Sequence, residues 1–231
     1  MGPLRQALRV ILRPAEGFRE TASEAPTLGP SIRRMLAWWL PAAYAHAGLS
    51  AWSALRVYQA LRAGWLPAWT GVVLPAGLDP EGLQDLLRQL PAPPSLVHIG
   101  LWLLVLVPVG VLGAWLHHAV WDHTCLWLLG GLKERRGFRA SLVAEAQALR
   151  IAALGTVAAL LGFIPVAGVA LGLPLALLDA YLWVFRGFSM AAFHGCPTWK
   201  GVAATVLHAV LVGLCALGLL AAFAALVGRP A

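Results

Sequence analysis

The chain has 231 residues and a formal net charge of +7, yet only 12% of its residues are charged and 60% are hydrophobic. An ordinary soluble domain holds about 25% charged residues, and a globule this apolar would lack the polar side chains needed to cover its surface. We therefore expect an integral membrane protein. The three cysteines (Cys125, Cys196 and Cys215) are an odd number, so they cannot form a closed disulfide framework in which every cysteine is paired.

Residues 1–13 predict a short amphipathic helix. Its apolar face would carry Leu4, Leu8, Ile11 and Leu12, with arginines at 5, 9 and 13 beside it. Such a helix would lie on an anionic cytoplasmic leaflet, and the alternative is a plain solvated basic segment. A linker is predicted over 21–31, so that 1–33 form a cytoplasmic N-terminal region. We expect no secretory signal, because the apolar run in residues 1–13 is too short and no small-residue cleavage site follows it. We expect no N-myristoylation, because Gln6 stands where the myristoylation motif needs Ser or Thr.

Apolar stretches over 34–231 predict an all-α, polytopic membrane bundle of about five spans. Each stretch approaches the roughly 20 residues that a hydrocarbon layer of about 30 Å requires. An outer loop is expected at 56–95, with a short amphipathic helix near Leu83–Leu90. Pro165 and Gly168 divide a helical hairpin whose arms are short, so this hairpin either crosses fully or is re-entrant. The predicted spans are 35–55, 96–120, 148–164, 169–186 and 202–226.

The distribution of Lys and Arg predicts the orientation, because these residues favour the cytoplasmic side. With the N-terminus inside, that side holds Arg5, Arg9, Arg13, Arg19, Arg33, Arg34, Lys133, Arg135, Arg136, Arg139, Arg150, Arg186 and Lys200; the outer side holds Arg56, Arg62, Arg88 and Arg229. The basic cluster Lys133, Arg135, Arg136 and Arg139 is expected to face anionic lipid headgroups. Because the charge follows the membrane pattern, no nucleic-acid partner is expected.

Asp179 is the one acid inside the predicted spans. An ionisable group at membrane depth costs a few kcal/mol and normally faces a partner within the bundle. His208 lies about seven residues, or ~10 Å, above the cytoplasmic end of its span, and Asp179 lies at the same height above Arg186. We predict a hydrogen bond between Asp179 and His208. It would serve as a packing clamp or as part of a proton or ion relay.

The segment from His117 to His123 contains residues of metal-ligand type. His118 and Asp122 are four apart on a helix and could share an ion, with His123 beside them. Polar residues at a helix end near headgroups explain the same pattern without a metal. A membrane haem would need facing ligands such as His46 and His208, which no pattern pairs. We expect no cofactor and no resident metal.

Enzyme motifs are absent from the sequence. It contains no G-x-S-x-G, no H-E-x-x-H and no G-x-x-x-x-G-K-[ST] segment. We therefore expect a non-enzymatic protein.

Gly168 and Gly172 form a small-xxx-small pair that suits close helix packing.

The order of features in the second half of the chain resembles the Yip family, the Ypt/Rab-interacting membrane proteins, in its bacterial form. His123 is followed by Leu128-Leu129-Gly130-Gly131, a basic stretch, Gly137-Phe138, Ile164-Pro165-Val166-Ala167-Gly168, and then His194-Gly195 with Thr198 and Lys200. Ile11-Leu12-Arg13-Pro14 and Phe18 are similar to that family's entry segment. The resemblance covers residues 8–215 and implies five spans, a cytoplasmic N-terminus and a bacterial inner membrane, but no settled activity. Cys196-Pro197 and the long outer loop depart from the family pattern.

Two functions follow as hypotheses. One is a non-enzymatic scaffold that organises the membrane or recruits a partner, such as another membrane protein or a second copy, through its basic face. The other is transport of ions, protons or lipid along a polar path near Asp179. A water-filled cavity that reaches Asp179 would favour transport, and a fully packed bundle would favour the scaffold.

Overall fold

The computed structural model describes residues 3–63, 85, 87–132 and 136–227, and this part of the chain is helical with short connections. Four segments are long and apolar enough to cross a membrane, judged by length and composition: α5, α6 together with the following 3-10 turn, α7 and α8. The protein is thus a multi-pass, all-α membrane protein. The elements are α1 (Pro3–Leu12), α2 (Pro14–Ser23), α3 (Leu28–Arg62), α5 (Leu96–Leu128), α6 (Gly137–Ala159), the 3-10 turn η1 (Leu160–Phe163), α7 (Pro165–His194) and α8 (Thr198–Val227).

The first predicted span, 35–55, lies inside α3, which is 35 residues long. This helix is not among the four apolar segments, because Trp, Tyr, His and Ser side chains interrupt its apolar residues. A fifth crossing by α3 therefore stays a prediction.

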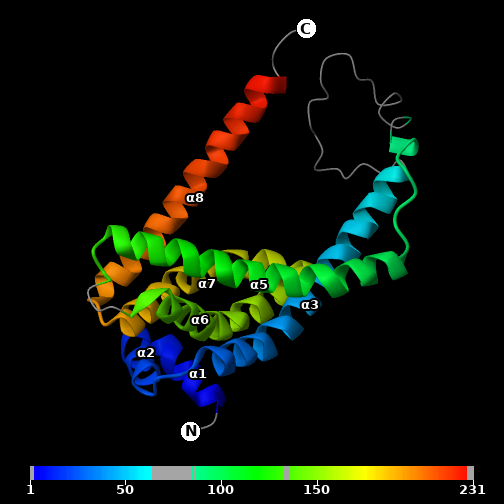
Figure 1. Ribbon diagram of the computed structural model, residues 1–231. Coiled ribbons are helices and arrows are strands. Elements are labelled where there is room, and N and C mark those ends of the chain that lie inside the picture. The colour runs from blue at the N-terminus through cyan, green and yellow to red at the C-terminus, as the bar shows by residue number, and fades with distance from the viewer. Residues whose placement is uncertain (1–2, 64–84, 86, 133–135, 228–231) are drawn as a thin grey trace.

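Helix α6 lies at the centre of the bundle, packed against α3, α5 and α7. Its residues from Val143 to Leu149 are all buried. Helix α8 packs on α7 and α5 near its start and then projects away from the bundle (Figure 1). The large side chains of its far half, including Leu214 and Phe223, are exposed, as is expected of a lipid-facing segment.

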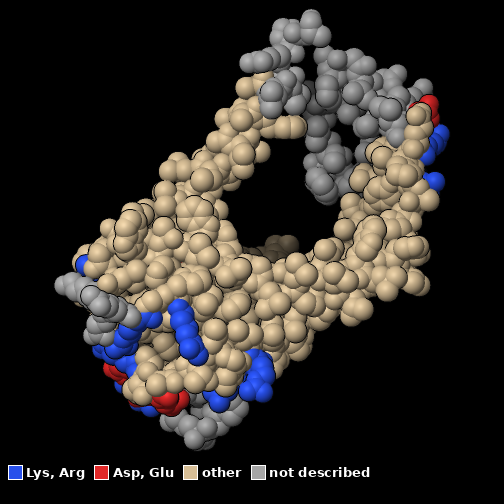
Figure 2. Space-filling model, viewed as in Figure 1, with Lys and Arg blue, Asp and Glu red and all other residues tan. Residues whose placement is uncertain are grey.

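Charged side chains gather at the two ends of the visible face, with a broad uncharged belt between them (Figure 2). The larger group lies at the end formed by α1 and α2 (Figures 1 and 2). A belt of this kind is what a hydrocarbon layer requires of the surface it touches.

The N-terminal helices pack on the bundle. Phe18 of α2 meets Phe185 of α7 edge to face, with ring centroids 4.8 Å apart, and the Tyr181 hydroxyl donates a 2.6 Å hydrogen bond to the Ile11 carbonyl. The face of α1 that packs on the protein carries Ala7 and Val10, while Leu8 and Leu12 of the predicted apolar face are exposed. The membrane contact expected of that apolar face stays a prediction.

The predicted linker over 21–31 is wrong for most of its length, because only 24–27 lie outside helices. Thr21 continues α2, and its hydroxyl donates to the Gly17 carbonyl. Pro30 lies in the first turn of α3, where a missing N–H breaks no helical hydrogen bond.

The predicted break at Pro165 is confirmed. Helix α6 gives way to η1, Ile164 is extended, and Pro165 is the first residue of α7. Both arms exceed the predicted 148–164 and 169–186, because the helices continue through polar residues toward the basic end. At about 1.5 Å per residue, α7 is about 45 Å long, which permits a full crossing of a ~30 Å layer.

Two other predictions fall partly outside the described residues. Of the helix expected near Leu83–Leu90, residues 83, 84 and 86 lie outside the described residues, while Asp85, Leu87 and Arg88 are helical. Lys133 and Arg135 of the basic cluster also lie outside. Arg136 donates a 3.1 Å hydrogen bond to the Phe193 carbonyl, and Arg139 is exposed.

Helices α7 and α8 touch backbone to backbone at Gly187 and Gly201. A Cβ on Gly187 would stand 2.6 Å from the Gly201 carbonyl oxygen, and a Cβ on Gly201 would clash with the Gly187 carbonyl oxygen. This is the kind of close approach that the sequence analysis assigned to Gly168 and Gly172. Gly168 instead contacts Gly162 inside the hairpin, and Gly172 has open space around it.

We expect Gly201→Val to separate α7 from α8 and to lower the free energy of unfolding by at least 1–3 kcal/mol, the usual cost of overpacking. Gly218→Val is the matched control on the same helix, since a Cβ there meets nothing within 4 Å. Thermal unfolding in detergent, followed by size-exclusion chromatography, measures both. Equal midpoints for the two variants would contradict the contact.

Candidate functional site

A buried carboxylate joins three of the long helices. Asp122 of α5 has no exposed surface. Its Oδ1 accepts a 2.6 Å hydrogen bond from Nδ1 of His208 on α8, and its Oδ2 lies 3.5 Å from Nη2 of Arg186 on α7. All three side chains are buried, so Asp122 is held from two sides by groups that are distant in the sequence.

A second carboxyl group comes from α6. Glu145 is fully buried and lies close enough to Asp122 for the two carboxyl groups to influence each other. Among the described residues, no donor reaches either of its carboxyl oxygens. Two carboxyl groups thus adjoin one guanidinium. Because a buried unpaired charge is costly, the second carboxyl group requires one more positive charge, supplied by a proton or by a bound cation.

The four residues lie at similar depth. Asp122 is about 9 Å from the C-terminal end of α5, and Arg186 about 12 Å from that of α7, at about 1.5 Å per residue. Glu145 is about 12 Å from the start of α6 and His208 about 15 Å from the start of α8. These helix ends belong to the α5–α6 and α7–α8 connections, so the cluster forms one polar layer inside candidate spans.

Tryptophan rings cover the cluster. Trp121 stacks on His208 with centroids 5.8 Å apart and planes 10° apart, and Trp183 lies 5.4 Å from the same ring. The Arg186 guanidinium sits 4.2 Å from the Trp183 ring centroid, a cation–π distance. Apolar walls of this kind strengthen the electrostatic interactions that they enclose.

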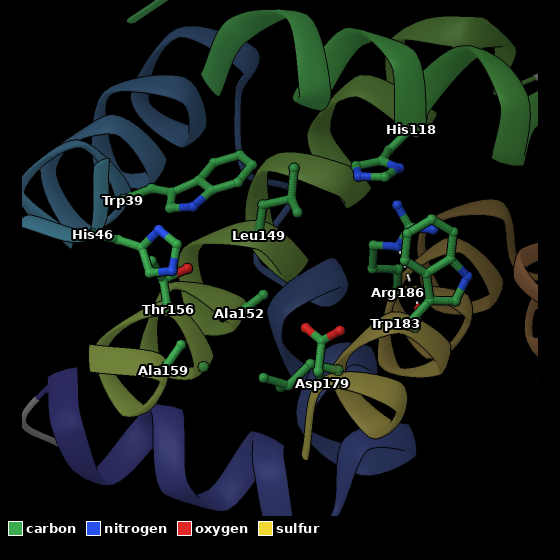
Figure 3. Close-up of a pocket in the computed structure, with 12 residues that line it drawn as sticks. Trp39, His46, His118, Leu149, Ala152, Thr156, Ala159, Asp179, Trp183 and Arg186 are labelled. Carbon is green, nitrogen blue, oxygen red and sulfur yellow. Dashed lines mark hydrogen bonds between the residues drawn. The ribbon is translucent and has the colours of Figure 1, made fainter. Parts of the chain in front are cut away.

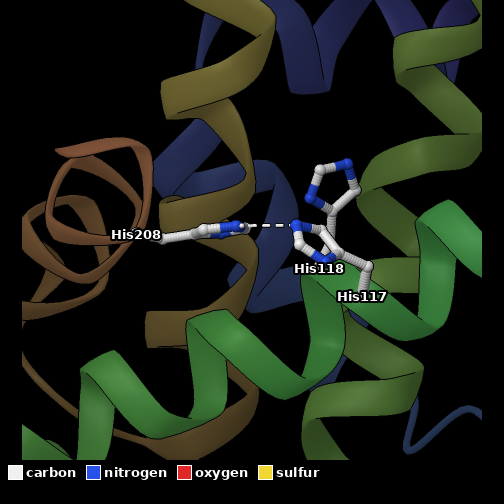
Figure 4. Close-up of side chains that lie close together, drawn as sticks. All are labelled: His117, His118 and His208. Carbon is white, nitrogen blue, oxygen red and sulfur yellow. Dashed lines mark hydrogen bonds between the residues drawn. The ribbon is translucent and has the colours of Figure 1, made fainter. Parts of the chain in front are cut away.

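Two further histidines of α5 adjoin His208. The Nε2 atoms of His117 and His208 are 3.2 Å apart. The His118 ring centroid lies 5.6 Å from that of His208. Figure 4 shows the three rings brought together, His117 and His118 from α5 and His208 from α8.

A cavity of about 410 Å³ opens beside the cluster. Its wall includes His118 and Arg186 at one end, and His46 of α3 and Thr156 of α6 elsewhere. The Asp179 carboxylate points into it (Figure 3). The cavity thus adjoins the polar cluster directly, through two shared residues.

The predicted hydrogen bond between Asp179 and His208 is wrong. His208 uses its two ring nitrogens on Asp122 and His117, and Asp179 is exposed on the cavity side. The prediction assumed that the helix ends at Arg186, whereas α7 continues to His194. This continuation places Asp179 about 22 Å from the helix end and His208 only about 15 Å from the corresponding end of α8.

The predicted grouping of His118, Asp122 and His123 is only partly right. His118 and Asp122 both adjoin His208. His123 faces another way, about 100° around the helix from Asp122. Its Nδ1 lies 2.8 Å from the hydroxyl of Ser141, which lies 2.8 Å from His194.

The haem pair that the sequence analysis weighed does not form either. The His46 ring stacks edge to face on Phe163 of η1, 5.4 Å away, while His208 pairs with Asp122. The structure therefore gives these two histidines different partners.

The site predicted from the sequence does not include Glu145 or Arg186. Glu145 fell just before the predicted 148–164 span, and Arg186 was assigned to the end of 169–186. One signal was available, since Glu145 stands alone among small and apolar residues in the sequence SLVAEAQAL. An acid in that setting is typical of a buried helix face with a partner.

No family model matches this chain, and neither a curated protein nor a solved structure matches it. The resemblance to the Yip family therefore stays a prediction.

We expect Asp122→Ala to lower the free energy of unfolding by about 3–5 kcal/mol, because it leaves Arg186 buried without its counter-ion. Glu145→Gln should change it by about 1 kcal/mol or less, since no donor to the carboxylate is lost and the amide can donate to Asp122. Asp179→Asn, at an exposed acid, is the control and should change it by about 0.5 kcal/mol or less. Thermal unfolding in detergent ranks the three variants. If Asp122→Ala is no less stable than Asp179→Asn, the buried ion pair is refuted.

Proposed function

We propose that this chain is a non-enzymatic transport protein that moves protons or small cations across a membrane. The observation that carries the proposal is the cavity of about 410 Å³, which Asp179 faces and which adjoins the buried Asp122 cluster. Ionisable residues at membrane depth are expensive, and they usually mark substrate or ion pathways. A cavity at this place is also the feature that separates the transport hypothesis from a fully packed scaffold.

A series of polar contacts leads from the cavity, within the polar layer, to the surface of α5. Arg186 lines the cavity and lies 3.5 Å from Asp122. Asp122 binds His208 at 2.6 Å, and His208 lies 3.2 Å from His117. His117 is exposed on the outer surface of α5. Asp122, His208 and His117 are close enough for a proton to pass between neighbours after a small side-chain movement. Arg186 stays charged and holds the Asp122 carboxylate beside the cavity.

The scaffold function is the second candidate. It is favoured by α1, where Leu8 and Leu12 are 49% and 79% exposed and Arg13 is exposed beside them. We propose that this face lies in the headgroup region of the inner leaflet, where anionic lipids attract arginine. Such a surface would serve membrane organisation, partner recruitment or self-association.

The topology proposed for either function has five crossings. Helix α3 supplies the first crossing, and the α6–α7 hairpin crosses fully. The N-terminus and the connections after α5 and α7 lie in the cytoplasm, in agreement with the positive-inside distribution. A bacterial inner membrane is the proposed location.

The transport proposal is tested by ion flux. The full chain is reconstituted in proteoliposomes with a pH-sensitive dye inside, and a potassium diffusion potential drives proton entry. We expect flux above that of protein-free vesicles, and at least a tenfold loss in Asp122→Asn and in Asp179→Asn. Both variants keep the side-chain volume and remove a negative charge from the path.

Asp85→Asn is the matched control, because Asp85 lies in the connection before α5 with an exposed side chain. Its flux should equal that of the unsubstituted chain. Absence of proton, monovalent-cation and divalent-cation flux in the unsubstituted protein would overturn the proposal.

The topology is tested by labelling. Single cysteines replace Ser23, Ala63 or Val166 in a chain whose native cysteines are alanine, and a membrane-impermeant maleimide is added to inside-out and right-side-out vesicles. Val166 is 82% exposed at the tip of the hairpin. We expect Ser23→Cys to react from the cytoplasmic side, and Ala63→Cys and Val166→Cys from the other. Labelling of all three from one side would exclude both the α3 crossing and the full hairpin.

A further inference from the structure

Three imidazole rings from two helices meet beside Asp122. One ring nitrogen each of His117, His118 and His208 lies within 4.8 Å of the other two. In a tetrahedral zinc site with bonds of about 2.0–2.1 Å, ligand nitrogens are about 3.3 Å apart. The 3.2 Å between Nε2 of His117 and Nε2 of His208 meets that spacing, and a nitrogen of His118 lies within 4.8 Å of both ligand atoms.

Asp122 orients one of the three rings. Its carboxylate accepts the Nδ1 proton of His208 at 2.6 Å, which leaves the lone pair of the neutral ring on Nε2, the atom that faces His117. A carboxylate behind a ligating histidine fixes the tautomer and the ring direction, and it raises the basicity of the ligand. The ring position thus has the support that metal-binding histidines usually show.

A plain hydrogen bond between His117 and His208 accounts for part of this geometry. It does not account for His118, whose Nδ1 is buried and has no hydrogen-bond partner among the described residues. The His118 ring nevertheless stands 5.4 Å from that of His117 and 5.6 Å from that of His208. A third imidazole with an unused buried nitrogen is explained by a ligand that all three share.

The surrounding charges also allow a cation. Arg186 opposes one, but the carboxyl groups of Asp122 and Glu145 both adjoin it, and Glu145 has no donor in reach among the described residues. The Asp122 carboxylate lies 3.5 Å from the Arg186 guanidinium and offsets its charge. The Glu145 carboxyl group can release a proton when a cation binds, and the resulting carboxylate would offset part of the charge of a divalent ion.

We propose that His117, His118 and His208 bind one divalent transition-metal ion of the zinc class, with Asp122 as the orienting carboxylate. Imidazole ligands suit zinc, copper, nickel and cobalt, whereas magnesium and calcium require oxygen ligands. As a statement about the cargo, this rests on the transport function proposed above, because it names the cation that would use the path. Binding itself can be measured without any flux.

The test uses the full chain, purified in detergent without a polyhistidine tag. Zn²⁺ alone is titrated by calorimetry, and Co²⁺ binding is followed by visible absorption, which reports tetrahedral coordination. We expect one Zn²⁺ per chain and no comparable binding of Mg²⁺. His117→Ala should weaken Zn²⁺ binding at least tenfold, and Asp122→Asn should weaken it about 10–100-fold.

His117 is the preferred ligand to remove, because its exposed position leaves the buried Asp122–His208 pair intact. His98→Ala is the matched control on the same helix, since His98 is exposed at the start of α5 and bonds only Ser95 in the described structure. It should bind Zn²⁺ as the unsubstituted chain does. The site is refuted if the chain binds no stoichiometric Zn²⁺, or if a His117→Ala/His118→Ala double variant binds it unchanged.

Flux measurements distinguish the proposed metal site from the proposed transport function. Zn²⁺ binding without flux of any ion would refute transport while confirming the site. Proton flux in a chain that binds no Zn²⁺ would refute the site while supporting transport. Zn²⁺ flux that His117→Ala abolishes and His98→Ala preserves would support both.

Discussion

The cost of burying a carboxylate among apolar helices governs the arrangement of this protein. Asp122 has no exposed surface, and a charge in that position persists only where other groups neutralise it. Its two oxygens meet His208 of α8 and Arg186 of α7. The ends of α5, α7 and α8 are thereby held together, although lipid supplies no hydrophobic force to associate them.

The remaining polar contacts near the same helix ends act in the same way. The Ser189 hydroxyl donates to the Ala144 carbonyl at 2.7 Å, and Trp115 donates to the Leu142 carbonyl at 3.0 Å. The Gln147 amide donates to Ser31 of α3 at 2.9 Å. Helix α6 is thus bonded to α7, α5 and α3, which explains why it lies at the centre although it holds fewer apolar residues than α5 or α8.

The sequence predicts the membrane class, most helices and the hairpin break well, because hydropathy and proline act locally. It fails at polar residues near predicted span ends. A hydropathy window ends a span where Glu145 or Arg186 begins to count against it, yet both helices continue. Arg186 pairs with Asp122 inside the bundle, and Glu145 is buried there as well. The pairing of Asp122 with His208 joins residues 86 apart in the sequence, and no local pattern records which helix faces which.

The candidate site was predictable in composition and not in arrangement. The sequence marks four of its members as ionisable residues in or near predicted spans: His117, His118, Asp122 and His208. Their grouping depended on the rotation of α5 and α8 about their own axes, which side-chain packing determines. Asp179 was recognised as important, and its actual place on a cavity wall follows from the length of α7.

The glycine contact between α7 and α8 is a point about which α8 can tilt. The two helices touch through backbone at Gly187 and Gly201, and His208 lies seven residues farther along, about 10 Å from that point. A tilt of about 10° around it would move the His208 ring by about 2 Å. That is enough to break the contact with Asp122 or with His117 while the helix crossing itself stays in place. The exposed far half of α8 lies on the other side of His208 from this contact. A change in the lipid around that half that tilts α8 would therefore displace the His208 ring from Asp122.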